Sequence, residues 1–323
     1  MKNIWIDGIM GVVIGDALGM PVQFRDRNEV KQSPVLGMEG YGTYNMPPGT
    51  WSDDSSMTLA ALDSIREKGK IDSDDIMQRF VDWYENGAYT PHGIAFDMGT
   101  TCVKAIGRYG NPYTYKECGC TDEYSNGNGS LMRIMPACLF VYEQVKKEVL
   151  AEEKGLELIH EVSALTHAHL RSKMACGFYY FMIKAILDEE GTLISKLQKG
   201  VDDAVRFYHR DFANLVQMAY YGRLFHLGEF INVPEDEIKS SGYVVDSLEA
   251  AVWSLITTET FEEGLLKAVN LGGDTDTIGA IAGGLAALHY GYNNIPAEWR
   301  STIIKEEQII ALCELVEEEF HVR

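Results

Sequence analysis

Two short segments of the chain combine carboxylates with hydroxyls at closely spaced positions. The first is GTWSDDSS at residues 49–56, and the second is GGDTDT at residues 272–277. Each is followed directly by an apolar segment with helical periodicity, at 57–62 and 278–281. Ser, Thr and Asp at a helix start satisfy free backbone N–H groups and complement the helix dipole. For either segment alone, helix capping is the simplest interpretation.

The surroundings of the two segments favour a different interpretation. A cap needs one such residue and tolerates solvent, whereas both segments adjoin apolar, small-residue helices that should be buried. Carboxylates that converge in a core require a counterion, yet neither segment contains Lys or Arg. Oxygen donors without His or Cys favour Mg²⁺ or Mn²⁺ over zinc, and the spacing does not fit a calcium-binding EF-hand. Two sets of ligands indicate two ions.

A third segment, SNGNGS at residues 125–130, has the composition of a turn. It precedes the apolar run 131–136, and its glycines could expose backbone N–H groups to an anion, as loops before helices do. His167 lies further along, between Thr166 and a second histidine, His169. Taken alone, His167 is typical of an ordinary hydrogen-bonded histidine.

The elements that must position these residues are helical. Apolar residues recur three and four apart in nine segments, which are 4–18, 54–68, 74–85, 154–165, 171–188, 246–257, 261–270, 277–290 and 302–320. Alternating strand patterns are nearly absent, the best being residues 242–245. No repeat and no Pro, Gly or Ser linker divides the chain. We therefore predict an all-α fold in one domain over residues 1–323.

Two of these helices are rich in small residues. Gly8, Gly11, Gly15 and Gly19 recur three or four apart in the first, and residues 279–287 of another contain mostly Gly and Ala. Each interior Gly costs about 1 kcal/mol relative to Ala. Close approach of two helices would offset this cost, so we expect a tightly packed core pair.

Composition excludes several classes of protein. The chain has 48 Asp and Glu against 28 Lys and Arg, a net charge of −20, which argues against direct nucleic-acid binding through counterion release. Asp7 and Asp16 interrupt any apolar stretch that could serve as a secretory signal, and the longest nearly apolar run, 278–288, is too short to span a bilayer. The six scattered cysteines lack zinc-site spacing and are typical of free thiols. We expect a soluble cytoplasmic protein.

The ordered motifs together resemble the ADP-ribosylglycohydrolase family, which includes the dinitrogenase-reductase-activating glycohydrolases and the J1-type crystallins. The match runs nearly end to end. Besides the two acidic segments, it takes in GDALG at 15–19, FDMGTT at 96–101, GNGSLMR at 127–133, ALTH at 164–167 and YVVDSLEAA at 243–251.

The resemblance implies a compact all-α domain of orthogonally packed helices with a binuclear Mg²⁺ or Mn²⁺ site in a cleft. It also implies hydrolysis of the glycosidic bond at ribose C1 of ADP-ribosylated protein side chains or small ADP-ribosyl conjugates. Asp97 would lie beside the metals, and the catalytic proton would pass to Asp54, Asp97 or Asp276. His167 would contact the nucleotide. The implied metal ligands are Ser52, Asp53, Asp54, Asp274, Asp276 and Thr277. The implied contacts to pyrophosphate and ribose are Ser125, Asn126, Gly127, Asn128, Gly129 and Ser130.

One position departs from the family pattern. Many members carry Glu shortly after GDALG, where this chain has Gln23. Gln can coordinate a cation or donate a hydrogen bond but cannot accept a catalytic proton. Gln23 therefore keeps open a non-catalytic ADP-ribose binder or crystallin-like protein. A second alternative is another dimetal phosphohydrolase, which would share the acidic ligands but cleave at phosphorus.

Overall fold

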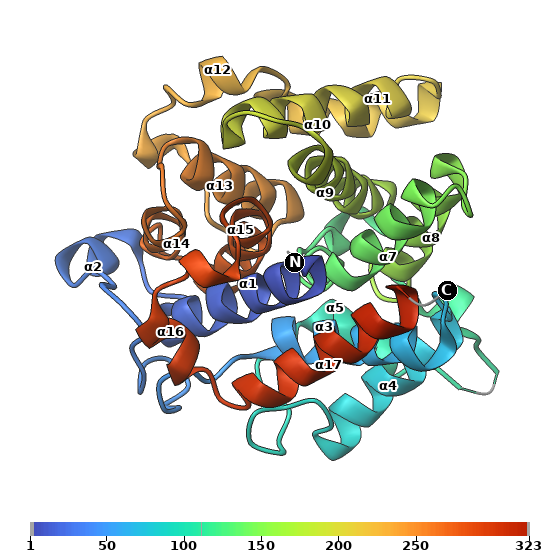
Figure 1. Cartoon of the computed structure of the whole chain (residues 1–323), viewed down its shortest axis with the longest axis horizontal. Coiled ribbons are helices and arrows are strands. Elements are labelled where there is room, and N and C mark those ends of the chain that lie inside the picture. The colour runs from blue at the N-terminus through green and yellow to red at the C-terminus, as the bar shows by residue number, and fades with distance from the viewer. Residues whose placement is uncertain (1–2, 111, 322–323) are drawn as a thin grey trace.

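Helices are the regular elements throughout residues 3–110 and 112–321, the part of the chain that the computed structural model describes (Figure 1). Within this part only isolated bridges occur in place of a sheet, as between Gly127 and Tyr243. The all-α prediction is confirmed. The α-helices are α1 (Ile4–Gly19), α2 (Arg27–Gln32), α3 (Asp53–Lys68), α4 (Ser73–Asn86), α5 (Thr100–Ile106), α6 (Tyr115–Cys118), α7 (Met135–Lys146), α8 (Glu152–Ala164), α9 (Leu170–Asp188), α10 (Leu193–Tyr208), α11 (Phe212–Met218), α12 (Leu227–Phe230), α13 (Val244–Ile256), α14 (Phe261–Val269), α15 (Thr275–Tyr290), α16 (Ala297–Thr302) and α17 (Glu306–His321).

Each of the nine predicted helical segments corresponds to a helix. Two details need correction, one helix boundary and the one strand pattern. The segment 302–320 was predicted as one helix, but α16 ends at Thr302 and α17 begins at Glu306. Between them Lys305 has φ 63°, which a continuous α-helix does not allow. The strand pattern at 242–245 is also wrong, because Tyr243 is the N-cap of α13 and the two valines form its first turn.

The first and the fifteenth helix form the tightly packed pair that the glycines predicted. A Cβ atom on Gly11 would lie 2.3 Å from the carbonyl oxygen of Gly283, and one on Gly15 would lie 1.9 Å from that of Gly279. Residue numbers rise along α1 as they fall along α15, so the pair is antiparallel. Figure 1 shows the two helices side by side, although they come from opposite ends of the chain.

Substitution of Gly15 by Ala should therefore destabilise the fold strongly. The methyl group would meet backbone atoms of α15 that cannot move aside independently, and we expect a loss of about 3 kcal/mol or more in unfolding free energy, at the upper end of overpacking effects. Urea denaturation measures the change. Gly228→Ala is the matched control, because its Cβ would meet nothing within 4 Å. Equal stability of the two variants would contradict the close crossing.

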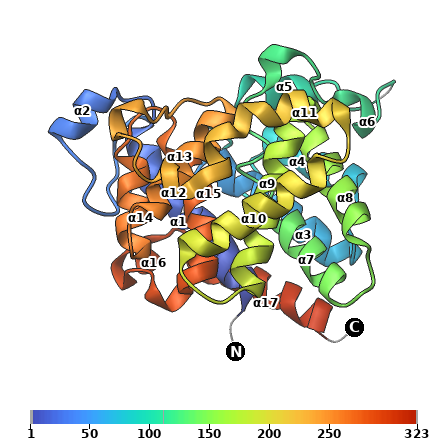
Figure 2. The same cartoon turned by 90° about the horizontal axis from the view of Figure 1, so that it is seen from above.

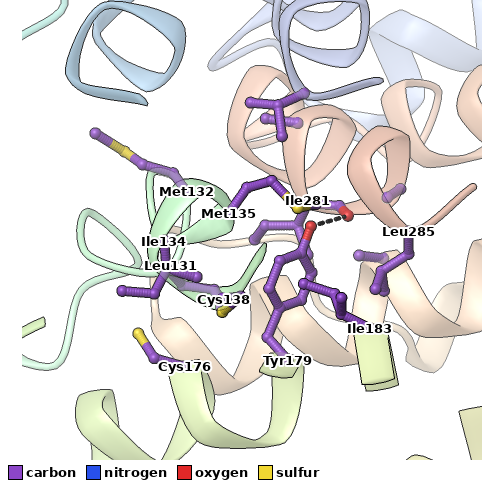
Figure 3. Close-up of a cluster of buried hydrophobic side chains, with 14 of the residues drawn as sticks. Leu131, Met132, Ile134, Met135, Cys138, Cys176, Tyr179, Ile183, Ile281 and Leu285 are labelled. Atoms are coloured by element: carbon purple, nitrogen blue, oxygen red, sulfur yellow. Dashed lines mark hydrogen bonds between the residues drawn. The ribbon is translucent and has the colours of Figure 1, made fainter. Parts of the chain in front are cut away.

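The antiparallel pair brings the end of α1 to the start of α15. The Thr275 hydroxyl donates to the carbonyl of Gly19 at 2.8 Å, so the GDALG and GGDTDT motifs meet at one end of the pair. On another side, the Tyr179 hydroxyl of α9 donates to the carbonyl of Ile281 at 3.0 Å, beside Met135 of α7 (Figure 3). These contacts anchor the second acidic segment in the core.

The remaining helices enclose this centre. Helices α10 to α12 lie along one edge of the molecule and α4 and α17 along the opposite edge, while α2 projects at one end (Figures 1 and 2). The segment Ile4–Val22 is apolar and long enough to cross a membrane, but 89% of its hydrophobic window is buried inside the protein. Such burial is typical of the core helix of a globular fold.

Candidate active site

Asp16, from the GDALG motif, positions the start of α3. Its carboxylate accepts hydrogen bonds from the backbone N–H groups of Ser52, at 2.9 and 3.0 Å, and Ser55, at 3.1 Å, and from the Ser55 hydroxyl at 2.6 Å. Burial raises the pKa of Asp16 to about 6, and these hydrogen bonds oppose the rise. A residue of another helix therefore binds N–H groups at the start of α3, where a capping side chain would otherwise be needed.

The helix-capping interpretation of the two acidic segments fails. Ser52 and Asp274 occupy the N-cap positions of α3 and α15, but neither side chain makes a capping hydrogen bond. Because Asp16 supplies the cap of α3, the side chains of Asp53 and Asp54 are not needed for it. Their burial, with 5% and 1% exposed, has no explanation in helix termination.

The two acidic segments lie together in space. The Thr277 hydroxyl is 3.4 Å from a carboxylate oxygen of Asp54, across 223 residues of sequence. The pKa values of Asp53, Asp54 and Asp276 are raised well above the usual range, first by burial and then by neighbouring carboxylates. Burial also raises the pKa of Asp274, and hydrogen bonds from Asn128 and Gln23 oppose that rise. The cluster thus concentrates negative charge in a desolvated place.

No cation of the described residues compensates this cluster. Within the described residues, none of its aspartates lies within 4.0 Å of a Lys, Arg or His nitrogen as an ion pair, and the salt bridges lie elsewhere. Buried oxygen atoms of Asp54 (Oδ1), Asp97 (Oδ2) and Asp276 (Oδ2) also lack a hydrogen-bond partner among the residues that the structure describes. Uncompensated carboxylate oxygens of this kind suit a hard divalent cation.

The donor set therefore fits the implied Mg²⁺ or Mn²⁺ in its chemistry. Within the described residues, no three acidic, His or Cys side chains already close around one point as metal ligands do. The two ions stay a prediction. The residues that could hold them are the six named from the sequence: Ser52, Asp53, Asp54, Asp274, Asp276 and Thr277.

Asp97 approaches the cluster from a loop rather than a helix. It has φ 55°, an uncommon conformation for a residue other than Gly, and its carboxylate accepts a hydrogen bond from the Tyr44 hydroxyl. Burial and this contact raise the pKa of Tyr44, so the phenol stays protonated and can only donate to Asp97. Asp97 also raises the pKa values of Asp53 and Asp276, which places its charge beside theirs.

A cavity of about 510 Å³ opens over these residues. Its walls include Asp53, Asp54, Asp97, Asp274, Thr277 and Gln23. Ser52 and Asp276 are fully buried and absent from the cavity lining. A cavity of this size suits a nucleotide-sized ligand.

The glycine-rich loop forms another part of the cavity wall, but only part of the predicted set faces the cavity. Gly127, Asn128, Gly129 and His167 line it, and Asn128 donates to Asp274 at 2.5 Å. The prediction for three other residues finds no support in this geometry. Ser125 donates to Asp122, Asn126 binds Glu123 and Ser172, and Ser130 faces Ser163 and Cys176 in the core.

Phe24 stands at the rim in a strained conformation. Its side chain is 65% exposed, and its φ is 65° although it is a bulky aromatic residue. Its N–H donates to the carbonyl of Gly273 at 2.6 Å, which ties the strained residue to the second acidic segment. A left-handed conformation costs a residue with a Cβ about 1 to 2 kcal/mol.

We expect Phe24→Gly to be more stable than Phe24→Ala by about 1 kcal/mol, because only Gly relieves this strain. Urea denaturation of the two variants isolates the backbone effect, since both lack the aromatic ring. An alanine variant as stable as the glycine variant would show that residue 24 is not held in the left-handed region.

Several residues of the site carry no local signal in the sequence. Tyr44 and Phe24 are isolated aromatic residues in loops, and Cys102 lines the cavity as a buried thiol. Asp16 was recognised only as part of a motif. The apolar surroundings of Asp16, in a helix without other charges after Asp7, are the one signal that could have marked it as a buried, partnered carboxylate.

Comparisons with known proteins find similarity over nearly the whole length of the chain. A model of the ADP-ribosylglycohydrolase family matches residues 5–323. The chain is 30% identical over 306 residues to ADP-ribosylarginine hydrolase Tri1 of Serratia proteamaculans, covering 95% of this chain and 76% of that protein. It is also 30% identical over 306 residues to the ADP-ribosyl-(dinitrogen reductase) glycohydrolase of Rhodospirillum rubrum, covering 92% and 89%.

The fold agrees as well. A solved structure described as an ADP-ribosylglycohydrolase-related protein complex superposes with a TM-score of 0.78 at 28% sequence identity. The superposition covers 98% of this chain and 98% of that one. Sequence and structure therefore match known proteins over nearly the whole chain.

Proposed function

Because the chain belongs to the ADP-ribosylglycohydrolase family, we propose that it hydrolyses the glycosidic bond at ribose C1 of an ADP-ribosylated substrate and releases ADP-ribose. The observation that carries the proposal is the convergence of two uncompensated acidic segments under a nucleotide-sized cavity with a glycine-rich wall. The substrate would be an ADP-ribosylated protein side chain or a small ADP-ribosyl conjugate. The name of the Serratia relative favours an arginine linkage.

The chemistry would require positive charge beside the carboxylates. Bound Mg²⁺ or Mn²⁺ would neutralise the aspartates, hold the ribose hydroxyls and polarise the attacking water. The two ligand sets would be residues 52–54 and residues 274–277, as described above. The reaction would pass through an oxocarbenium-like state at C1, as in other glycoside hydrolyses.

The residues of this chain would orient the substrate and receive the proton. Asp54 and Asp97 line the cavity, whereas Asp276 lies behind its wall, so the first two are the better candidates for the base. Tyr44 would hold one oxygen of Asp97 and leave the other free for the water proton. The glycine-rich loop would present Asn128 and backbone groups to the pyrophosphate and ribose.

The test is turnover on a panel of arginine-, serine- and nucleic-acid-linked ADP-ribose with Mg²⁺ or Mn²⁺. We expect free ADP-ribose from the arginine-linked substrate, loss of turnover on chelation, and recovery when either ion is added back. Release of AMP or orthophosphate without ADP-ribose would instead identify a phosphohydrolase.

The six buried free cysteines support a reducing compartment, so we also propose a cytoplasmic location.

A further inference from the structure

A buried arginine lies behind the glycine-rich wall of the cavity. Arg133 has 0% of its surface exposed, and within the described residues it has no carboxylate partner. Its guanidinium lies over the ring of Phe80, 4.6 Å from the centroid, and donates to the carbonyl of Val162 at 3.3 and 3.4 Å. A buried cation without a counterion is costly. Arg133 makes one further hydrogen bond, to Thr166, and this bond indicates the role of the buried guanidinium.

That hydrogen bond starts a chain of fixed polarity. Arg133 Nη2 donates to Thr166 Oγ1 at 2.8 Å, and because a guanidinium has no acceptor, the hydroxyl must be the acceptor here. The same Oγ1 lies 2.8 Å from Nδ1 of His167. The Cys102 thiol also lies near this hydroxyl, but sulfur is a weak acceptor and competes poorly with a ring nitrogen for its proton. The Thr166 proton therefore points to Nδ1.

A neutral histidine that accepts at Nδ1 carries its proton on Nε2. Burial and the charge of Arg133 lower the pKa of His167 to about 3, so the ring is neutral at physiological pH. The ring edge faces the loop: a Cβ on Gly127 or on Gly129 would lie 3.4 Å from Nε2. His167 lines the cavity there, and the described residues offer its Nε2–H no acceptor.

We propose that Arg133 and Thr166 are positioning residues that hold His167 as the Nε2–H tautomer, so that its ring donates a hydrogen bond to an acceptor atom of the bound ADP-ribosyl group. The identity of this ligand rests on the proposed function, whereas the tautomer is a property of the chain alone. The opposite tautomer would present a lone pair to an anionic ligand and repel its acceptor atoms. The relay thus gives an acidic protein a neutral donor whose direction does not change with pH.

The tautomer can be measured without any turnover. In a ¹⁵N-histidine-labelled protein, long-range proton–nitrogen spectra distinguish a protonated from an unprotonated ring nitrogen, and His167→Gln assigns the signal among the 8 histidines. We expect an unprotonated Nδ1 and a protonated Nε2 for His167 in the wild type. A protonated Nδ1 would overturn the relay, whatever the activity of the enzyme.

Thr166→Val and Thr166→Ser form the matched pair of variants. Valine keeps the shape of threonine and removes the hydroxyl, so we expect mixed tautomers at His167. We also expect ADP-ribose binding and KM to weaken by about 10-fold, the scale of one hydrogen bond, with kcat changed by less than about 3-fold. Serine keeps the hydroxyl and should restore the tautomer and the affinity.

Each outcome bears on a separate claim. An unchanged tautomer and an unchanged dissociation constant for ADP-ribose in Thr166→Val would overturn the proposal. If the valine variant does not fold, the wild-type spectrum and the serine variant still decide it. If the wild type does not bind ADP-ribose at all, the proposed function fails, while the spectrum continues to test the relay.

Discussion

Asp276→Asn is expected to lower kcat by at least about 1000-fold and to abolish the thermal stabilisation of the protein by Mg²⁺ or Mn²⁺. A 1000-fold loss corresponds to about 4 kcal/mol of transition-state stabilisation, which is within the several kcal/mol that a catalytic cation can supply. Asp276 is fully buried, and one of its carboxylate oxygens has no partner. Asparagine keeps the shape of the side chain but removes the charge that a cation requires.

The stability of the metal-free protein separates this explanation from a folding defect. Burial, and after it the neighbouring carboxylates, raise the pKa of Asp276, so desolvation and repulsion inside the cluster oppose folding when no cation is bound. Removing one carboxylate should leave the metal-free melting temperature unchanged or higher. The wild type should gain about 2.7 kcal/mol when the free ion is at 100 times its dissociation constant.

Thermal melts of the two proteins with and without the ion measure both effects. Asp236→Asn is the matched control, because it removes a surface aspartate that pairs with Lys31 and is 82% exposed. It should leave turnover and the response to the ion unchanged. If Asp276→Asn kept the wild-type response, the acidic cluster would not be a cation site.

The apolar pattern predicted nine helices correctly because their buried residues recur at helical spacing. Among the longer helices it still missed α7 and α10, although Leu193, Leu197, Val201, Ala204 and Tyr208 of α10 are buried along one face at helical spacing. That signal was present and was overlooked. The boundary between α16 and α17 depends on a left-handed residue, Lys305, for which the side-chain pattern gives no warning.

The site was less accessible to sequence reasoning, because its contacts cross large distances along the chain. The acidic segments identify themselves by composition, but capping of α3 by Asp16 depends on two helices meeting. The direction in which a loop side chain points is also set by its neighbours. Asn128 and Ser130 are two residues apart in one motif, yet Asn128 faces the cavity and Ser130 the core.

Gln23 is the position where the chain departs from its family, and the structure gives it a definite place. Its side chain is 4% exposed and lines the cavity. Its amide nitrogen donates to Asp274 at 3.3 Å, while its buried amide oxygen finds no partner in the described part of the chain. The free oxygen points to a water, a cation or a substrate hydroxyl as its missing partner.

Gln23→Ala is expected to lower turnover by roughly 10- to 1000-fold, the scale of losing a positioned polar contact in a transition state. This variant removes the amide oxygen from the cavity and also removes the amide donor to Asp274. Gln23→Glu should not keep wild-type turnover. It would place a second carboxylate about as close to Asp274 as the Gln23 amide nitrogen is now, at 3.3 Å. We therefore expect Gln23→Glu to depend more strongly on the divalent ion than the wild type does.

The turnover of wild type, Gln23→Ala and Gln23→Glu on the same linkage panel at fixed metal concentration decides between an enzyme and a binder. If Gln23 only fills space, the alanine variant should keep wild-type turnover. If the chain is a non-catalytic binder, the wild type should bind ADP-ribose without cleaving any linkage, and only the glutamate variant should gain turnover. We expect an active wild type, because Asp53, Asp54 and Asp276 remain buried and uncompensated, a costly arrangement that a protein without a cation-dependent reaction has no physical reason to keep.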